Sequence, residues 1–358
     1  MSGTVRMGAR VRRRAPVAVL CLVLLVVLAA APYTLAVYPL KVLTEVLIYV
    51  IFAMSLDLLF GYTGLASLGH ALYFGVGGYT AGLLAVHYTP SALVGLGAGL
   101  GAGAVSAVAT GWLAIRSRSV YFIMLTLAFS ELAFSVATSW RSLTGGDQGL
   151  IGIQPASLPG GTRFNGVLNL PTFYYYVAIV AVACYLLMRL VVRSPFGLSL
   201  LGIRENEARM RSLGYPVFRY KLAAYVVAGA FAGLAGSLYV QYSDFVSPDY
   251  IGFELSALVL VMVMVGGAGT LYGAVLGSAF VVVLRDELSA AFQQWEAVLG
   301  AVFIAFVYFL PSGLAGLVRL AGGLGRGRAG RGGGGSTGSG PGPAASDVDL
   351  TATAEANR

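Results

Sequence analysis

The stretch RLVVRSPFGLSLLGIRENEARMRSLGYPVFRYK, residues 189–221, is the longest strongly charged segment between two apolar blocks of the chain. It contains seven basic residues and only two acidic ones. Ser194 is a preferred helix cap, Pro195 suits the first helical position, and Gly214 suits the position just after a helix end. These signals predict a short helix that lies outside the bilayer.

The predicted helix has one charged face and one apolar face. Glu205 precedes Arg209 by four residues, an arrangement that stabilises a helix by about 0.2 to 0.5 kcal/mol. Glu207 and Arg211 have the same spacing. We therefore expect an amphipathic helix with a single apolar stripe to bury, made of Phe196, Leu200, Ile203, Met210 and Leu213.

The composition of the whole chain is that of a polytopic membrane protein. Of its 358 residues, 58% are hydrophobic and only 11% are charged, whereas about 25% are charged in a soluble domain. The net charge of +8 does not indicate nucleic-acid binding, because the basic residues flank apolar runs. Cys21 and Cys184 lie inside apolar runs without metal or disulfide spacing, so we expect buried thiols and no metal site.

The apolar runs predict an all-α polytopic membrane protein with about 10 transmembrane helices. The eighth and ninth runs are shorter than the ~20 residues of a straight span, and GGAG at residues 266–269 separates them. A broken or re-entrant pair is therefore expected there. The first run also fits a cleavable signal peptide. We favour an uncleaved helix, because the run is long enough to span the membrane. The predicted spans are residues 16–37, 42–60, 68–86, 91–115, 120–140, 171–190, 222–242, 250–265, 272–283 and 295–310.

The basic residues are distributed unequally between the two sides that ten spans define. With a cytoplasmic N-terminus, the inner side holds five before residue 15, two at residues 116–118, seven in residues 189–221 and five after residue 311, or 19 of the 23. Cytoplasmic loops are rich in Lys and Arg, so both termini and the charged segment are predicted to be cytoplasmic. The exceptions are Lys41, Arg141, Arg163 and Arg285.

These patterns divide the chain into three parts. Residues 1–15 form a basic cytoplasmic N-terminus, and residues 16–318 form the transmembrane domain, with its charged loop at 191–218. Residues 319–358 are rich in Gly, Ser and Pro and lack an apolar period, so a disordered cytoplasmic tail is expected.

Few polar side chains fall at membrane depth. A charge at the bilayer centre costs at least ~2.5 to 3.5 kcal/mol, so such a residue faces a bundle interior, a partner or water. Glu131 lies in the middle of a predicted span and is the best candidate for a functional or helix-pairing acid. Asp57 lies near a predicted span end, where hydration at the interface is expected.

The run GYTGLASLGHALYFGVGGYT, residues 61–80, places Ser67 and His70 among glycines. Glycines at membrane depth either allow close helix packing or mark an unwound segment that lines a cavity, and the sequence leaves both open. An intramembrane protease built on this serine and histidine is disfavoured, because the base needs a third group that orients it.

A phosphate-binding Gly-x-x-x-x-Gly-Lys-Ser/Thr sequence is absent from the chain, so a partner must supply any ATP hydrolysis. Several ordered motifs then make the chain resemble the LivM-type permease subunits of bacterial branched-chain amino acid ABC importers. The resemblance covers about residues 42–318. It rests on GYTGLASLGHALYFGVGGYTAGLL (61–84), RSRSVYFIMLTLAFSE (116–131), TGGDQGL (144–150), the segment 203–239, FVSPDY (245–250), VMVGGAGTLYGAVLG (263–277) and FLPSGLAGL (309–317).

The resemblance implies that the chain is a transport subunit and not an enzyme. It implies a LivH-like second permease subunit, two cytoplasmic ATPase subunits of the LivG and LivF type, and an external substrate-binding protein. The chain itself would bind no cofactor, because ATP-Mg belongs to the ATPases. It would lie in the bacterial cytoplasmic membrane as a multi-pass protein.

The resemblance also assigns roles to residues. The segment 203–214 would be the helix that couples the permease to an ATPase, with contacts at Ile203, Arg204, Glu205, Asn206, Glu207, Arg209, Met210 and Gly214. The translocation path or its gate would involve Gly64, Ser67, His70, Glu131, Gly145, Gly146 and Asp147.

Two alternatives to branched-chain amino acid import stay open. Permeases of urea and short-chain amide importers are very similar to the LivM type. An ion-coupled secondary transporter is a different class, in which Glu131 and Asp57 would be proton or sodium sites.

Overall fold

The computed structural model describes residues 30–117, 119–157, 163–164, 166–167, 169–291, 294–309 and 313–316. Contacts divide the chain into two units, Met1–Val318 and Arg319–Arg358, and all described residues belong to the first. The predicted basic N-terminus, most of the first predicted span and the predicted disordered tail lie outside the described residues.

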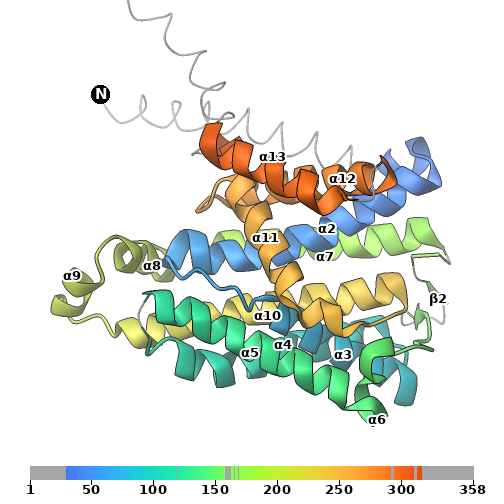
Figure 1. Ribbon diagram of the computed structural model, residues 1–358, viewed down its shortest axis with the longest axis horizontal. Helices are drawn as coiled ribbons and strands as arrows, with labels where there is room; N and C mark the ends of the chain where they lie inside the picture. The colour runs from blue at the N-terminus through green and yellow to red at the C-terminus, as the bar shows by residue number, and fades with distance from the viewer. Residues whose placement is uncertain are drawn as a thin grey trace, which may run out of the picture. The chain divides into compact units, whose positions relative to one another are not determined.

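The described part is helical, apart from one antiparallel pair of two-residue strands, which agrees with the predicted all-α fold (Figure 1). The pair joins Ala156 to Phe164 and Ser157 to Arg163. In chain order the elements are α2 (Val37–Asp57), the π-helix η1 (Leu58–Thr63), α3 (Ala71–His87), α4 (Ala92–Ala114), α5 (Ser119–Ser139), α6 (Arg141–Thr144), the 3-10 helix η2 (Gly146–Gln148), β1 (Ala156–Ser157), β2 (Arg163–Phe164), α7 (Leu170–Arg193), α8 (Pro195–Glu205), α9 (Glu207–Ser212), α10 (Val217–Ser243), the 3-10 helix η3 (Pro248–Ile251), α11 (Phe253–Gly266), α12 (Leu271–Ala291) and α13 (Trp295–Phe309).

Within the described ranges, five helices are long and apolar enough to cross a membrane, or six if one bent pair counts as a span. The bent pair is α11 with α12, and the chain bends by 119° between them, across residues 267–270. The predicted broken or re-entrant pair is therefore present. The count of about 10 spans is not confirmed, since α3 has only 17 residues and α13 only 15.

The third predicted span begins later than the sequence suggests. Helix α2 continues without a gap into η1, so that Val37–Thr63 is one helical span of 27 residues. The chain then runs without regular structure from residue 64 to residue 70 before α3 begins. The glycine-rich run thus contains an unwound segment, which was one of the two alternatives left open.

Helices α2 and α10 form the centre of the unit. In the α2–η1 span, 78% of the residues in the most apolar stretch are buried. The corresponding share is 67% in α10 and only 22 to 28% in α4, α5 and α7. A helix that is hydrophobic all round is buried all round, and α2 has this pattern. The side chains of Ile48, Ile51, Phe52 and Met54 point in different directions around α2, yet all are fully buried.

Glycines set the spacing between α4 and α10. A Cβ added to Gly103 would lie 2.9 Å from the Cα of Gly233, and a Cβ added to Gly233 would lie 2.9 Å from the Cα of Gly103. Carbon atoms do not approach so closely, so both positions need glycine for the two backbones to touch. Such contacts between small residues drive helix association in membranes. The other alternative for the glycine-rich sequence, close packing, is therefore realised as well, since Gly77 of α3 also faces Gly233.

The charged segment lies at one end of the α2–η1 span. Arg204 of α8 donates a hydrogen bond to the carbonyl oxygen of Gly61 in η1. Arg116, in the turn after α4, lies over the ring of Phe218 at the start of α10, with 6.0 Å from guanidinium carbon to ring centre. The two groups of basic residues that were predicted to share a side are thus at the same end of the helices.

The opposite end carries basic residues that were predicted to lie on the other side. The hydroxyl of Tyr242 donates to the carbonyl oxygen of Lys41 at the start of α2, 3.4 Å away. Arg285 is 3.8 Å from Glu45 at the same end of α2. Residues 41 and 61 are about 30 Å apart along a helix. The structure therefore separates the basic residues into two groups, as a membrane-spanning arrangement requires.

The Gly103 contact gives a prediction about stability. Gly103→Leu should destabilise the protein by about 1 to 3 kcal/mol or more, because the new side chain meets backbone and not a movable side chain. Gly97→Leu is the matched control, since Gly97 lies on the same helix with nothing within 4 Å of an added Cβ. Thermal unfolding of the purified chain in detergent measures the difference. Equal melting temperatures for the two variants would contradict the assigned packing.

Candidate functional site

The charged segment forms two helices rather than the single helix that its sequence pattern predicted. Helix α8 ends at Glu205, and α9 begins at Glu207. Asn206 between them has an extended backbone, with φ −156° and ψ 95°. The predicted start is confirmed, because the Ser194 hydroxyl caps α8 by accepting a hydrogen bond from the backbone N–H of Gly197 at 3.4 Å. The predicted end is confirmed by the positive φ of Gly214, 84°.

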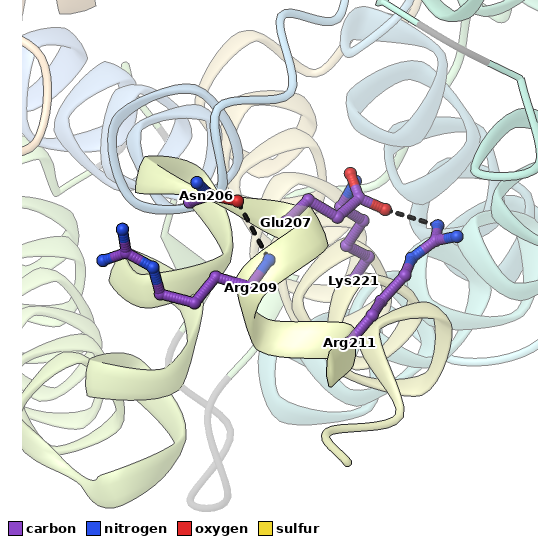
Figure 2. A network of polar contacts seen from close by, with 5 residues as sticks. All are labelled: Asn206, Glu207, Arg209, Arg211 and Lys221. Carbon is purple, nitrogen blue, oxygen red and sulfur yellow. Dashed lines mark hydrogen bonds and ion pairs between the residues drawn. The ribbon is translucent and has the colours of Figure 1, made fainter. Parts of the chain in front are cut away.

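Asn206 ends α8 and caps the beginning of α9. Its Oδ1 accepts a hydrogen bond from the backbone N–H of Arg209 at 2.9 Å, which is the bond of an N-cap residue (Figure 2). The break places Glu205 and Arg209 on different helices, so the predicted pair between them is wrong. Within the described residues, Glu205 forms no ion pair.

Glu207 holds α9 against α10. One carboxylate oxygen of Glu207 lies 2.6 Å from Nη2 of Arg211, which confirms the predicted pair, and the other lies 2.6 Å from Nζ of Lys221 (Figure 2). Lys221 belongs to α10, so a single carboxylate bridges the two helices. Partial burial raises the pKa of Glu207, but the hydrogen bonds and charges of Lys221 and Arg211 lower it by more, so its pKa lies below the ordinary value.

The predicted apolar stripe is divided between the two helices. Leu200 and Ile203 of α8 are buried, and Phe196 stacks on Tyr220 with ring centres 5.6 Å apart. In contrast, α9 has no buried residue, and Leu213 beside it is 66% exposed. Helix α8 therefore anchors the segment to the membrane helices, and α9 presents its surface outward.

Arg204 connects this segment to two interruptions in the membrane helices. It donates to the carbonyl oxygen of Gly61, and its Nη1 would lie 3.2 Å from a Cβ added to Gly269. Gly269 lies in the turn between α11 and α12, and its N–H donates to Oδ1 of Asp57 at 2.7 Å. Asp57 is fully buried, so the expectation that it lies in an hydrated interface is wrong.

The predicted path residues Gly64, Ser67 and His70 lie in or beside the unwound segment 64–70. Gly64 has a positive φ of 76°, and Ser67 and His70 are fully buried. The ring nitrogen Nε2 of His70 lies 2.8 Å from the hydroxyl of Ser55, not from Ser67. The serine–histidine pair of the protease hypothesis is therefore not formed.

The other predicted path residues lie on α5 and at its end. Glu131 is exposed on the outer face of α5. Gly145 and Gly146 both have positive φ, 80° and 65°, and form the tight turn into η2. Asp147 is exposed in that turn. The predicted set thus occupies three places: the unwound segment, the outer face of α5 and the loop after it.

Helix α5 lies between the unwound segment and the surface that carries Glu131. Its inner face packs against the unwound segment, where a Cβ on Gly69 would collide with the carbonyl of Thr126. One turn further on, the hydroxyl of Ser130 donates to the carbonyl oxygen of Ile251 in η3 at 2.6 Å. No local sequence pattern indicates these contacts, because they join residues far apart in the chain.

Comparison with known proteins identifies relatives along most of the chain. Residues 38–307 match the family described as "Branched-chain amino acid transport system / permease component". The chain is 32% identical to the high-affinity branched-chain amino acid transport system permease protein LivM of Salmonella typhimurium, over 83% of this chain and 74% of that protein. It is also 32% identical to LivM of Escherichia coli, over 84% and 75% of the two chains.

A second kind of permease is similar at a lower level. The chain is 25% identical to the high-affinity branched-chain amino acid transport system permease protein LivH of Escherichia coli, over 75% of this chain and 91% of that protein. No solved structure matches the chain.

The Glu207 bridge predicts a pH-dependent contact between α9 and α10. A carboxylate with a lowered pKa stabilises the folded contact above its unfolded pKa of about 4.3, and the contribution is lost as pH falls through the folded pKa. Glu207→Gln should therefore speed amide hydrogen exchange in α9 at pH 7, and the difference from wild type should vanish in the acid range. Glu205→Gln is the matched control, since Glu205 is exposed and unpaired among the described residues. Equal exchange in the two variants at pH 7 would contradict the bridge.

Proposed function

This chain belongs to the family of permease components of branched-chain amino acid transport systems, and we propose that it is one permease subunit of an ATP-driven importer for leucine, isoleucine and valine. Its proposed partner is a LivH-like second permease subunit, and the translocation path runs between the two. The similarity to LivM proteins along more than four fifths of the chain carries this proposal.

We propose that two ATPase subunits drive the transport. The sequence contains no Gly-x-x-x-x-Gly-Lys-Ser/Thr phosphate-binding loop. ATP with Mg²⁺ would be bound by the ATPases. Transport would then follow from differential stabilisation of inward and outward states, without covalent chemistry on the substrate.

Helix α9 is the proposed contact with an ATPase. It has no buried residue, and the chain just after it exposes Leu213 and Tyr215, 66% and 40% respectively. A short helix with charged residues around exposed apolar ones fits a groove on a partner. Anionic lipid headgroups would also attract the basic residues of the segment. The anchoring of α8 and the bridge from Glu207 to Lys221 favour a protein partner, because they hold α9 in a fixed position.

We place α9 on the cytoplasmic side of the bacterial inner membrane, together with both termini. The end of the helices that carries α9 also carries most of the described basic residues, which supports this orientation. The opposite end would face the external binding protein. There, Asp147 and Gln148 are exposed in η2 and are suited to receive substrate.

A reconstituted complex tests the function. We expect the chain, its second permease, the ATPases and the binding protein in liposomes to take up leucine only when ATP and Mg²⁺ are present. Isoleucine and valine should compete, and urea and acetamide should not. Uptake of urea would instead assign the chain to the urea and amide importers. Uptake by this chain alone along a proton or sodium gradient would indicate a secondary transporter.

A substitution in the exposed surface beside α9 tests the ATPase contact. Leu213→Glu should reduce co-purification of the ATPases and ATP-driven uptake, because a charge replaces an apolar contact of an interface. It leaves Glu207, which is needed to hold α9 in place, untouched. Ile151→Glu is the control, since Ile151 is 69% exposed at the opposite end of the helices. Unchanged ATPase co-purification in Leu213→Glu would remove α9 as the contact.

A further inference from the structure

One acid lies on the outer face of a membrane helix. Glu131 is the thirteenth of the 21 residues of α5, Ser119–Ser139, and its side chain is exposed. Helix α5 is the least buried of the five clear spans, with 22% of its apolar stretch buried. Its inner face is formed by Phe122, Thr126, Ser130 and Ala137.

The position of Glu131 needs a compensating partner. An ionised carboxylate near the middle of a bilayer costs at least ~2.5 to 3.5 kcal/mol, so it does not face lipid tails without compensation. In the part of the chain that the structure describes, no hydrogen bond or ion pair joins Glu131 to another residue. The compensating cation or water therefore comes from outside the described residues.

Small residues flank Glu131 on its helix face. Ala128 and Ser135, one turn before and one turn after it, are exposed and small, so they leave room beside the carboxylate. Met124, two turns before Glu131 on the same face, is 63% exposed, and Leu132 on the adjoining face is 62% exposed. A carboxylate bordered by apolar surface complements a ligand that has an ammonium group and an aliphatic side chain.

The helix also connects this surface to the proposed entrance. Glu131 lies eight residues before the end of α5, or about 12 Å along the helix. Beyond that end, after the short helix α6, η2 carries the exposed Asp147. One acid thus lies near the middle of α5 and a second lies in η2, beyond the end of the same helix, on the way that a cationic group would follow into the membrane.

We propose that the Glu131 carboxylate pairs with the α-ammonium group of the transported amino acid in the path between this subunit and the second permease. The inference rests on the proposed function. A fixed arginine or lysine of the second permease would neutralise Glu131 in every state of the transporter and leave it no role toward the substrate. A zwitterionic substrate brings its cation with it, and its aliphatic side chain uses the apolar surface beside Glu131.

The proposal is tested in the complete complex, with its second permease, ATPases and binding protein. Glu131→Gln keeps the size of the side chain and removes its charge. It should lower leucine uptake by about tenfold or more, as expected for the loss of a charged hydrogen bond. Glu131→Asp should retain a larger part of the uptake than Glu131→Gln. Glu254→Gln is the matched control, because Glu254 is an exposed acid in the first turn of α11, and it should transport like wild type.

A labelling experiment gives a readout besides uptake. In a chain whose two native cysteines are replaced by alanine, Glu131→Cys should react in the assembled complex with a water-soluble cationic methanethiosulfonate. Leucine-loaded binding protein with ATP should slow that reaction. A cysteine that does not react in the assembled complex would overturn the proposal, because it would be covered by lipid or by protein.

The remaining outcomes separate this proposal from the function on which it rests. Wild-type uptake by Glu131→Gln, in a complex that transports leucine, would overturn the role of Glu131 alone. Loss of the second permease from purified Glu131→Gln would also overturn it, because the acid would then serve assembly. A wild-type complex that takes up no leucine would overturn the proposed function and this inference together.

Discussion

The structure depends on the requirement that backbone polar groups within a membrane find partners inside the protein. A continuous helix meets this requirement by itself, but this chain interrupts its helices after Thr63 and after Gly266. Side chains from elsewhere satisfy the freed groups. The hydroxyl of Ser256 accepts from the N–H of Ala71 at 3.0 Å, and Asp57 accepts from the N–H of Gly269 at 2.7 Å. The interruptions are therefore specific structures and not merely gaps.

Arg204 gives these interruptions a connection to the charged segment. Its guanidinium donates to the carbonyl oxygen of Gly61 in η1. One turn earlier, at the end of α2, the carboxylate of Asp57 accepts from Gly269 in the turn between α11 and α12. A displacement of α8 thus acts directly on the end of the central span and on the bent pair. In the proposed transporter, these contacts connect the ATPase-binding helix α9, through α8, to the irregular parts of the membrane helices.

The sequence predicted the features that depend on neighbours in the chain. Ser194 and Gly214 mark the ends of the charged segment as expected, and the short eighth and ninth runs form a bent pair. The break at Asn206 escaped prediction, because asparagine within an otherwise helical pattern is compatible with both an interior position and a new cap. The burial of Asp57 escaped for another reason. Its partner is a backbone N–H 212 residues away, and no local pattern reports such a contact.

The glycine contact between α4 and α10 has a consequence for how the protein can move. Gly103 and Gly233 bring two backbones together without any side chain between them, so the contact has no rotamers through which one helix could slide past the other. We therefore expect α4 and α10 to move together as one rigid unit. In the proposed transport cycle we therefore expect rearrangement in elements that are held by side-chain hydrogen bonds or turns, such as α5 and the α11–α12 pair.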